Sequence, residues 1–207
     1  MIKIQLKDGK IKEYEKGVSV NFIAENISSG LARNIISASY NGQIVETKSI
    51  LNNDGKLEFY SWENIEGKMA FWHSSSHILA QVLEEFYPGI KLTIGPAIKN
   101  GFYYDVDLNN HKISDDDFLK IEKRFIEICR EKHEFKLREV SKKEAEKFYK
   151  KKNNKYKLEL ISELKDEKIT FCDHSNFTDL CKGGHIPNTS IIKAVKILNV
   201  SGAFWRG

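Results

Sequence analysis

The segment Ala70–Gly89, AFWHSSSHILAQVLEEFYPG, decides the fold of the larger part of this chain, because it combines the apolar spacing of a helix with two histidines. Apolar side chains recur every three or four residues, as on the core-facing side of a helix, at Ile78, Leu79, Val82, Leu83 and Phe86. At about 100° per residue, His73 and His77 point in one direction, nearly opposite to that stripe. The segment therefore predicts a helix, ended by Pro88-Gly89, whose histidine pair does more than fill the core.

A second pair with the same spacing lies far along the chain, in Asp179–His185, which reads DLCKGGH. Cys181 and His185 flank a glycine-rich turn there, so the two pairs together form HxxxH…CxxxH. Three imidazoles and one thiolate are a suitable tetrahedral donor set for Zn²⁺, and histidines four residues apart on a helix commonly present two of the ligands. The combination favours a chemical site over a purely structural one.

The residues leave the chemistry of this site open between metal binding and metal-free catalysis. Ser74 follows His73, so the HExxH motif of metalloproteases, with its general-base glutamate, is absent. Without a metal, a histidine could orient or deprotonate water, and Asp179 and Lys157 could set its protonation state by their charges. No GxxxxGK[ST] or GxGxxG pattern occurs, so the glycines are interpreted as turn residues and not as a phosphate loop.

Composition indicates a globular protein with room for one large or two modest domains, since 41% of its 207 residues are apolar. The net charge of +4, from 33 basic and 29 acidic residues, favours an anionic partner only mildly. Three cysteines without framework spacing argue against a disulfide scaffold and indicate a reducing compartment. No signal-like segment and no run of about 18 apolar residues occurs, so we expect a cytoplasmic protein with no membrane partner.

The first 61 residues predict a small separate domain. Alternating apolar residues and turn dipeptides indicate short strands over residues 1–6, 11–14, 38–40, 44–45 and 57–60. Ser19 is placed to cap one helix, whose apolar face is formed by Val20, Ile23, Ala24 and Ile27. One helix across a small sheet indicates a ubiquitin-like domain, and this part of the chain contains no histidine or cysteine.

The segment Trp62–Lys68 changes character and is interpreted as the boundary to a second domain. Capping signals at Ser114 and Ser141 predict two helices beyond the histidine helix. Further strands are expected over residues 91–94, 101–107, 169–173, 177–180 and 194–200. The abrupt end, SGAFWRG, indicates a fragment of a longer protein.

The other side chains with reactive groups are expected to be structural or superficial. Cys129 and Cys172 lie among apolar residues and are interpreted as buried thiols. His111, His133 and His174 lie among polar or charged residues and are expected at the surface.

A run of lysines follows the helix start predicted at Ser141 and can be interpreted in two ways. It comprises Lys142, Lys143, Lys147, Lys150, Lys151, Lys152, Lys155 and Lys157. The first reading is a solvated helix face followed by a charged exit loop. The second is a patch that faces the phosphates of a nucleic acid.

Taken together, the motifs HSSSH, IGPAIKNGFYYDVDL, DLCKGGH and SGAFWRG resemble the N-terminal part of bacterial-type threonyl-tRNA synthetases over the whole chain. The resemblance implies an α+β fold, with a ubiquitin-like β-grasp TGS domain over residues 1–61. A larger α+β editing domain would follow over residues 62–207, its HxxxH helix packed near a mixed or antiparallel sheet. Editing domains of alanyl-tRNA synthetases share HxxxH…CxxxH, and the aminoacylation domain would lie beyond residue 207.

The same resemblance implies a site and a reaction. The catalytic residues would be His73, His77, Lys157, Asp179, Cys181 and His185, and the substrate-binding residues Tyr104, Gly95 and Lys182. The expected activity is hydrolysis of serine mischarged to tRNA(Thr), by attack of water on the seryl ester without a cofactor. The full-length enzyme would attach threonine to tRNA(Thr) using ATP.

Two alternatives accompany this reading. The first is a zinc-dependent ester hydrolase of the alanyl type, with Zn²⁺ held by His73, His77, Cys181 and His185. The second is a non-catalytic module that binds tRNA. In the main reading, ATP and Zn²⁺ belong only to the missing aminoacylation domain. The partner is the acceptor end of tRNA(Thr) carrying serine, and the full-length protein is a homodimer formed through the missing domain.

Overall fold

The computed structural model describes residues 1–166 and 168–206, which divide into two units. The first unit comprises residues 1–74 together with 183–187, and the second comprises the other described residues. Glu167 and Gly207, the final residue of the SGAFWRG motif, lie outside the described residues. No helix in the described part of the chain is long and apolar enough to cross a membrane.

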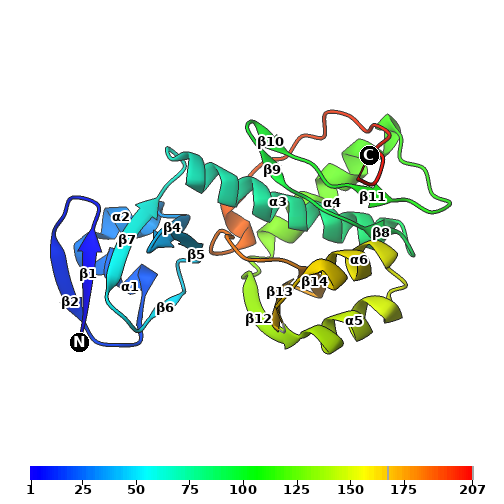
Figure 1. Cartoon of the computed structure of the whole chain (residues 1–207). Helices are drawn as coiled ribbons and strands as arrows, with labels where there is room; N and C mark the ends of the chain where they lie inside the picture. Colours follow the sequence, from blue (N-terminus) through cyan, green and yellow to red (C-terminus); the bar gives the residue numbers. More distant parts are fainter. Residues whose placement is uncertain (167, 207) are drawn as a thin grey trace. The chain divides into compact units, whose positions relative to one another are not determined.

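The first unit is built on a five-stranded mixed sheet in the order β2-β1-β7-β4-β5 (Figure 1). Its strands are β1 (Ile2–Leu6), β2 (Ile11–Tyr14), β4 (Ser37–Tyr40), β5 (Gln43–Val45) and β7 (Gly55–Tyr60). The central strands β1 and β7 are parallel, with Ile4 paired to Gly55, and the other neighbours are antiparallel. The five strands expected from alternation and turns are all present.

Helix α1 (Val20–Ile27) packs on this sheet and completes the core of the unit. As predicted, the Ser19 hydroxyl oxygen caps it and accepts the Phe22 amide at 3.1 Å. Val20 and Ile23 pack in one buried cluster with the apolar side of β1. The sequence reading did not include three short elements, which are α2 (Ser29–Asn34), β3 (Val18–Ser19) and β6 (Ile50–Leu51). A helix across a mixed sheet is the ubiquitin-like arrangement that the sequence predicts.

Helix α3 (Ile65–Phe86) carries the histidine pair and begins inside Trp62–Lys68, the segment interpreted as a boundary. Its first internal hydrogen bond runs from the Lys68 amide to the Asn64 carbonyl at 3.0 Å, and Asn is a favoured residue at helix starts. The helix is covered on the histidine side as well as on the apolar side, since residues 74–78 are at most 3% exposed.

Four short strands follow α3 in the second unit. They are β8 (Lys91–Leu92), β9 (Ala97–Ile98), β10 (Gly101–Phe102) and β11 (Val106–Asp107). β10 pairs with β9 and β11 with β8, both antiparallel. The single strand predicted over residues 101–107 is therefore wrong, because the chain changes its pairing partner within that segment. Tyr104 lies in the break.

A three-stranded antiparallel sheet and two helices form the second half of this unit (Figure 1). They are β12 (Lys136–Ser141), β13 (Lys168–His174), β14 (Phe177–Leu180), α5 (Lys142–Lys151) and α6 (Lys155–Glu163). The helices pack on the sheet through a buried cluster that includes Tyr149, Ile161 and Phe171. Helix and antiparallel sheet together confirm the α+β class, whereas α6 replaces part of the expected exit loop.

The capping signals and the buried thiols are confirmed. Helix α4 (Phe118–Arg130) follows the 3₁₀ turn η1 (Asp115–Asp117) and the capping box at Ser114, and the Ser141 hydroxyl oxygen caps α5. Cys129 and Cys172 are at most 1% exposed, and burial raises the pKa of Cys129 to about 12.

The last predicted strand is wrong. Residues 194–200 follow the 3₁₀ turn η2 (Thr189–Ile191) and form no strand. Leu198 is 84% exposed, so the apolar character of this segment does not reflect burial in a sheet.

Candidate functional site

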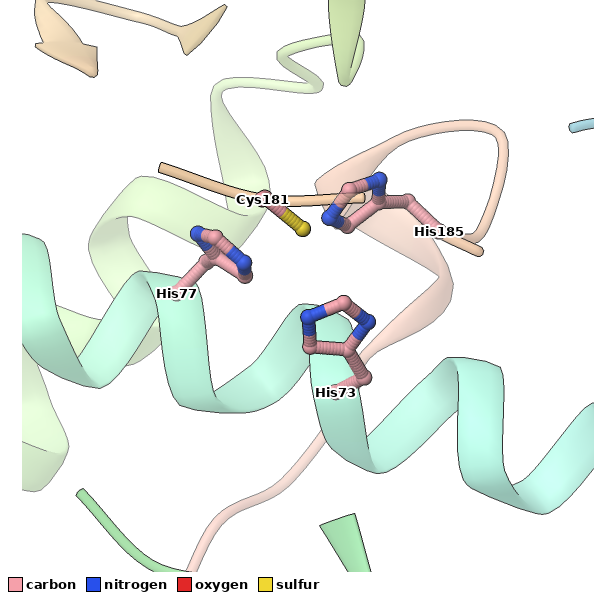
Figure 2. A group of neighbouring side chains, drawn as sticks. All are labelled: His73, His77, Cys181 and His185. Carbon is pink, nitrogen blue, oxygen red and sulfur yellow. The ribbon is translucent and has the colours of Figure 1, made fainter. Parts of the chain in front are cut away.

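The four side chains of HxxxH…CxxxH converge. His73, His77, Cys181 and His185 each bring one potential ligand atom to within 4.8 Å of the others. Figure 2 shows the histidines on successive turns of α3, with Cys181 and His185 facing them from one segment. The rings of His73 and His185 are stacked, with centroids 4.7 Å apart. His73 is half-buried, whereas the other three are buried. The motif thus predicts a real cluster in space.

The cluster could hold a metal ion, and its donor set fits zinc in kind. A closed tetrahedral zinc shell places its ligand atoms roughly 3.4–3.8 Å apart, which is tighter than the 4.8 Å span of the cluster. Zinc therefore fits only after a rearrangement of side chains.

A buried ion pair lies next to Cys181 in the sequence. The Asp179 Oδ1 atom is 2.5 Å from Lys157 Nζ, and the two side chains are 4% and 3% exposed. The same oxygen accepts the Tyr149 hydroxyl at 3.1 Å, and Oδ2 accepts the Tyr104 hydroxyl at 2.6 Å. The structure thus brings together Lys157, Asp179 and Tyr104, which the resemblance names.

The two tyrosines are fixed as donors. Burial, reinforced by the charge of Asp179, raises the pKa of both Tyr104 and Tyr149 well above the usual range. Both hydroxyls therefore stay protonated at physiological pH. The charge of Cys181 also raises the pKa of Tyr104, so Cys181 lies close enough to Tyr104 to influence it.

Gly95 provides space at this network. A Cβ atom at this position would overlap the ring of Tyr104, and it would lie 3.1 Å from Ser76 Oγ. The Gly95 carbonyl accepts the Ser76 hydroxyl at 2.6 Å. Lys182 is exposed. Substrate binding by Gly95 and Lys182 stays a prediction.

Tyr104 also lines a cavity of about 1030 Å³ in the second unit. Aromatic side chains form much of its wall, among them Phe102, Tyr103, Tyr156 and Trp205. Its size is adequate for a ligand as large as a nucleoside. None of the four cluster residues lines it.

A glycine turn presents His185, and two side chains of the first unit hold that turn. Gly184 has φ +87°, a conformation that glycine adopts without strain. Its amide donates to Glu46 Oε1 at 2.9 Å, and His185 Nδ1 lies 3.4 Å from the same oxygen. The Ile186 amide donates to Ser74 Oγ at 3.0 Å. Burial raises the pKa of Glu46, but the hydrogen bonds from His185 and Gly184 outweigh it and hold the pKa below its usual range.

The surface position expected for His174 is wrong. His174 is 2% exposed at the end of β13, with its ring 5.0 Å from Phe135 and 5.3 Å from Phe177. Its centroid lies 6.4 Å from that of His77. The available signal was strand alternation, because His174 lies two residues after the buried Cys172 and so shares its side of the strand.

Sequence reasoning missed Tyr149 and Glu46. The spacing of Tyr149 from Ala145 on α5 marks a core position, but not the hydrogen bond of its hydroxyl. Glu46 is 138 residues from Gly184, and no motif marks it. His111 and His133 are partly exposed, as expected.

Several lysines of this run make contacts that stabilise the fold. Lys142 donates to two carbonyls at the end of α6, Lys152 pairs with Glu84 at 2.8 Å, and Lys157 is buried. Three exposed lysines, spaced one turn apart on α5, leave the phosphate-facing reading open: Lys143, Lys147 and Lys151.

Comparison with known families agrees with the two-part organisation. Residues 2–61 match the TGS domain, and residues 169–203 match the threonyl and alanyl tRNA synthetase second additional domain. Over its full length the chain is 62% identical to a threonine–tRNA ligase of Flavobacterium johnsoniae and 49% identical to one of Cytophaga hutchinsonii. It covers 32% of each relative, so it spans about a third of their length. The chain therefore carries the TGS domain and the editing-type second additional domain found in the N-terminal region of bacterial threonyl-tRNA synthetases.

Proposed function

We propose that this chain hydrolyses serine mischarged to tRNA(Thr), and that the full-length protein is a threonine–tRNA ligase. The convergence of His73, His77, Cys181 and His185 carries the activity. The similarity of the whole chain to threonine–tRNA ligases supports the substrate. The proposed domains are TGS over residues 1–61 and editing over residues 62–207, supported by the TGS match over 2–61 and the start of α3 at Ile65.

The need for such an activity follows from the limits of binding. Serine is threonine without one methyl group, and a missing methyl is worth only about 1–3 kcal/mol, or roughly 10–200-fold in discrimination. A pocket that fits threonine cannot exclude the smaller serine. A second site can admit the seryl ester, reject threonine by its extra methyl and hydrolyse the ester.

In the proposed reaction, water attacks the seryl carbonyl and His73 takes the proton from that water. The new bond from the water oxygen to the carbonyl carbon pushes the carbonyl electron pair onto oxygen. When this pair returns, the bond from carbon to the ribose oxygen breaks, and the ribose oxygen takes the proton from His73 and leaves as a hydroxyl, so that free serine and tRNA(Thr) are the products. His73 is the half-buried member of the cluster, which favours its contact with water. The ion pair with Asp179 at 2.5 Å favours Lys157 as a cationic hydrogen-bond donor rather than as the base.

The remaining residues bind the substrate and its developing charge. His77, Cys181, His185 and Asp179 are proposed to hold the seryl group and the oxyanion. Tyr104, Gly95 and Lys182 are proposed to contact the acceptor end of the tRNA. The exposed lysines of α5 suit phosphate contacts.

Single-turnover deacylation of Ser-tRNA(Thr) tests the site. Removal of the base in His73→Ala is expected to slow hydrolysis about 10²–10⁴-fold. tRNA binding, measured by filter retention, should change little. His111→Ala is the matched control, because His111 is partly exposed and outside the cluster. Rapid hydrolysis by both His73→Ala and His185→Ala would reject the proposed site.

The donor set of the cluster favours a second candidate, a zinc-dependent version of the same hydrolase. Here His73, His77, Cys181 and His185 would hold Zn²⁺, which polarises a carbonyl or acidifies water. Stoichiometric zinc in the purified chain, measured by elemental analysis, separates the two candidates. A non-catalytic tRNA-binding module instead predicts tight binding and no turnover.

Three further proposals concern the full-length protein. ATP and Zn²⁺ would bind in the aminoacylation domain outside this chain, and a homodimer would form through that domain. A cytoplasmic location is expected for a tRNA ligase.

A further inference from the structure

We infer that Glu46, in the TGS part of the chain, is a positioning residue for His185. This inference rests on the proposed function, because it assigns to Glu46 the task of aligning one imidazole of the editing cluster. Glu46 and the turn that carries His185 both belong to the first unit, so the contact lies within one unit.

The backbone at Glu46 is held in place by its own unit. Glu46 directly follows β5, and its carbonyl accepts the Ser49 amide at 3.0 Å. The next carbonyls of the same turn, those of Thr47 and Ser49, accept the amides of Asn21 and Val20 at 2.7 and 3.1 Å at the start of α1. These hydrogen bonds join the turn to the start of α1 and hold the backbone of Glu46 in place.

The carboxylate of Glu46 makes three contacts with the turn that carries His185. Its Oε1 atom accepts the Gly184 amide at 2.9 Å and lies 3.5 Å from the His185 amide nitrogen. The same oxygen lies 3.4 Å from His185 Nδ1, and the His185 side chain is fully buried. Successive amides that follow positive-φ glycines form a concave anion site, and here a carboxylate fills it.

The contact with Nδ1 selects one tautomer of His185. A carboxylate accepts hydrogen bonds, so Nδ1 carries the proton that faces Glu46. Nε2 is then the ring nitrogen that faces the cluster with Cys181 and His73 (Figure 2). Carboxylates commonly fix histidines in this way, and their removal typically costs about 10–100-fold in activity or in metal affinity.

Long-range ¹H–¹⁵N spectra of the histidine-labelled chain test this assignment without any activity measurement. In the wild type, His185 Nδ1 should show a protonated-type shift and Nε2 an unprotonated-type shift. Glu46→Ala should exchange or average the two shifts and should move the Gly184 amide proton upfield. Glu46→Gln keeps an acceptor oxygen and should restore part of the wild-type pattern. Glu58→Ala is the matched control, since Glu58 lies on β7 of the same unit and pairs with Lys56 at 2.7 Å.

Deacylation kinetics provide a second test of the positioning role of Glu46. Glu46→Ala should slow single-turnover deacylation of Ser-tRNA(Thr) about 10–100-fold, with little change in the tRNA concentration for half-maximal rate. Unchanged His185 shifts in Glu46→Ala overturn the assignment whatever the activity. Moved shifts with an unchanged rate overturn the positioning role. If the wild type hydrolyses nothing, the proposed function fails, and moved shifts still uphold the contact of Glu46 with His185.

Discussion

Cys181 and His185 are four residues apart, yet different interactions hold them. Cys181 follows β14, and its amide donates to the Thr170 carbonyl at 3.1 Å. Asp179, which pairs with the buried Lys157, lies two residues before it. His185 follows a glycine turn that is held within the first unit by single side chains, those of Glu46 and Ser74. The strand side of the site is therefore anchored by a sheet and a buried charge pair, whereas the turn side depends on single hydrogen bonds. We expect substitutions on the strand side to cost stability and those on the turn side to cost mainly activity.

The largest stability loss is expected on the strand side, for Lys157→Met. This change leaves the Asp179 carboxylate buried without its cation, which typically costs about 3–5 kcal/mol of unfolding free energy. Urea titration followed by circular dichroism measures it. Lys168→Met is the matched control on β13, where the ion pair with Glu139 is exposed, and no measurable loss is expected. Equal losses in the two variants would show that the buried pair is not an anchor.

A smaller loss is expected for Gly95→Ala. The added Cβ overlaps the Tyr104 ring, which its hydrogen bond to Asp179 holds in place. Overpacking of this kind costs about 1–3 kcal/mol. Gly30→Ala is the control, since a Cβ there meets only Ser28 Oγ at 3.7 Å and alanine favours the helix α2. A Gly95→Ala chain as stable as Gly30→Ala would mean that Tyr104 is free to move.

The smallest stability loss, about 1 kcal/mol, is expected on the turn side for Ser74→Ala. The Ile186 amide loses its acceptor, and the turn that carries His185 loses one of its ties. Deacylation should nevertheless fall about 10–100-fold, because misplaced catalytic groups are costly to the rate. Ser162→Ala removes only a bond to the Glu159 carbonyl within α6 and should leave the rate unchanged. A Ser74→Ala chain that loses stability but keeps the wild-type deacylation rate would contradict the expected difference between the strand side and the turn side of the site.

The sequence predicts those parts of the fold that local rules govern. Alternation in β1 and the Ser19 cap of α1 are local signals, and both are confirmed. The start of α3 was misplaced because the change in composition at Trp62–Lys68 outweighed Asn64, whose residue type marks a helix start. The strand expected over residues 194–200 failed because pairing needs a partner strand, which apolar composition alone does not supply.

The same distinction between local and long-range signals applies to the candidate site. The spacing of His73 and His77 predicts that they share one side of a helix, and the CxxxH spacing of Cys181 and His185 predicts the second half of the site. The resemblance adds Tyr104. Contacts across long sequence separations are not predictable from either. Glu46 is the clearest case, since an ordinary surface-type residue makes its decisive contact with a turn 138 residues away.

Single-turnover deacylation of Ser-tRNA(Thr) and Thr-tRNA(Thr) by this chain, with and without a strong chelator, tests the central claim most directly. The account predicts selective loss of the seryl ester at a rate that the chelator does not change. Loss that the chelator abolishes would assign the chemistry to zinc. Hydrolysis of neither ester, or of both equally, would contradict the proposed editing function.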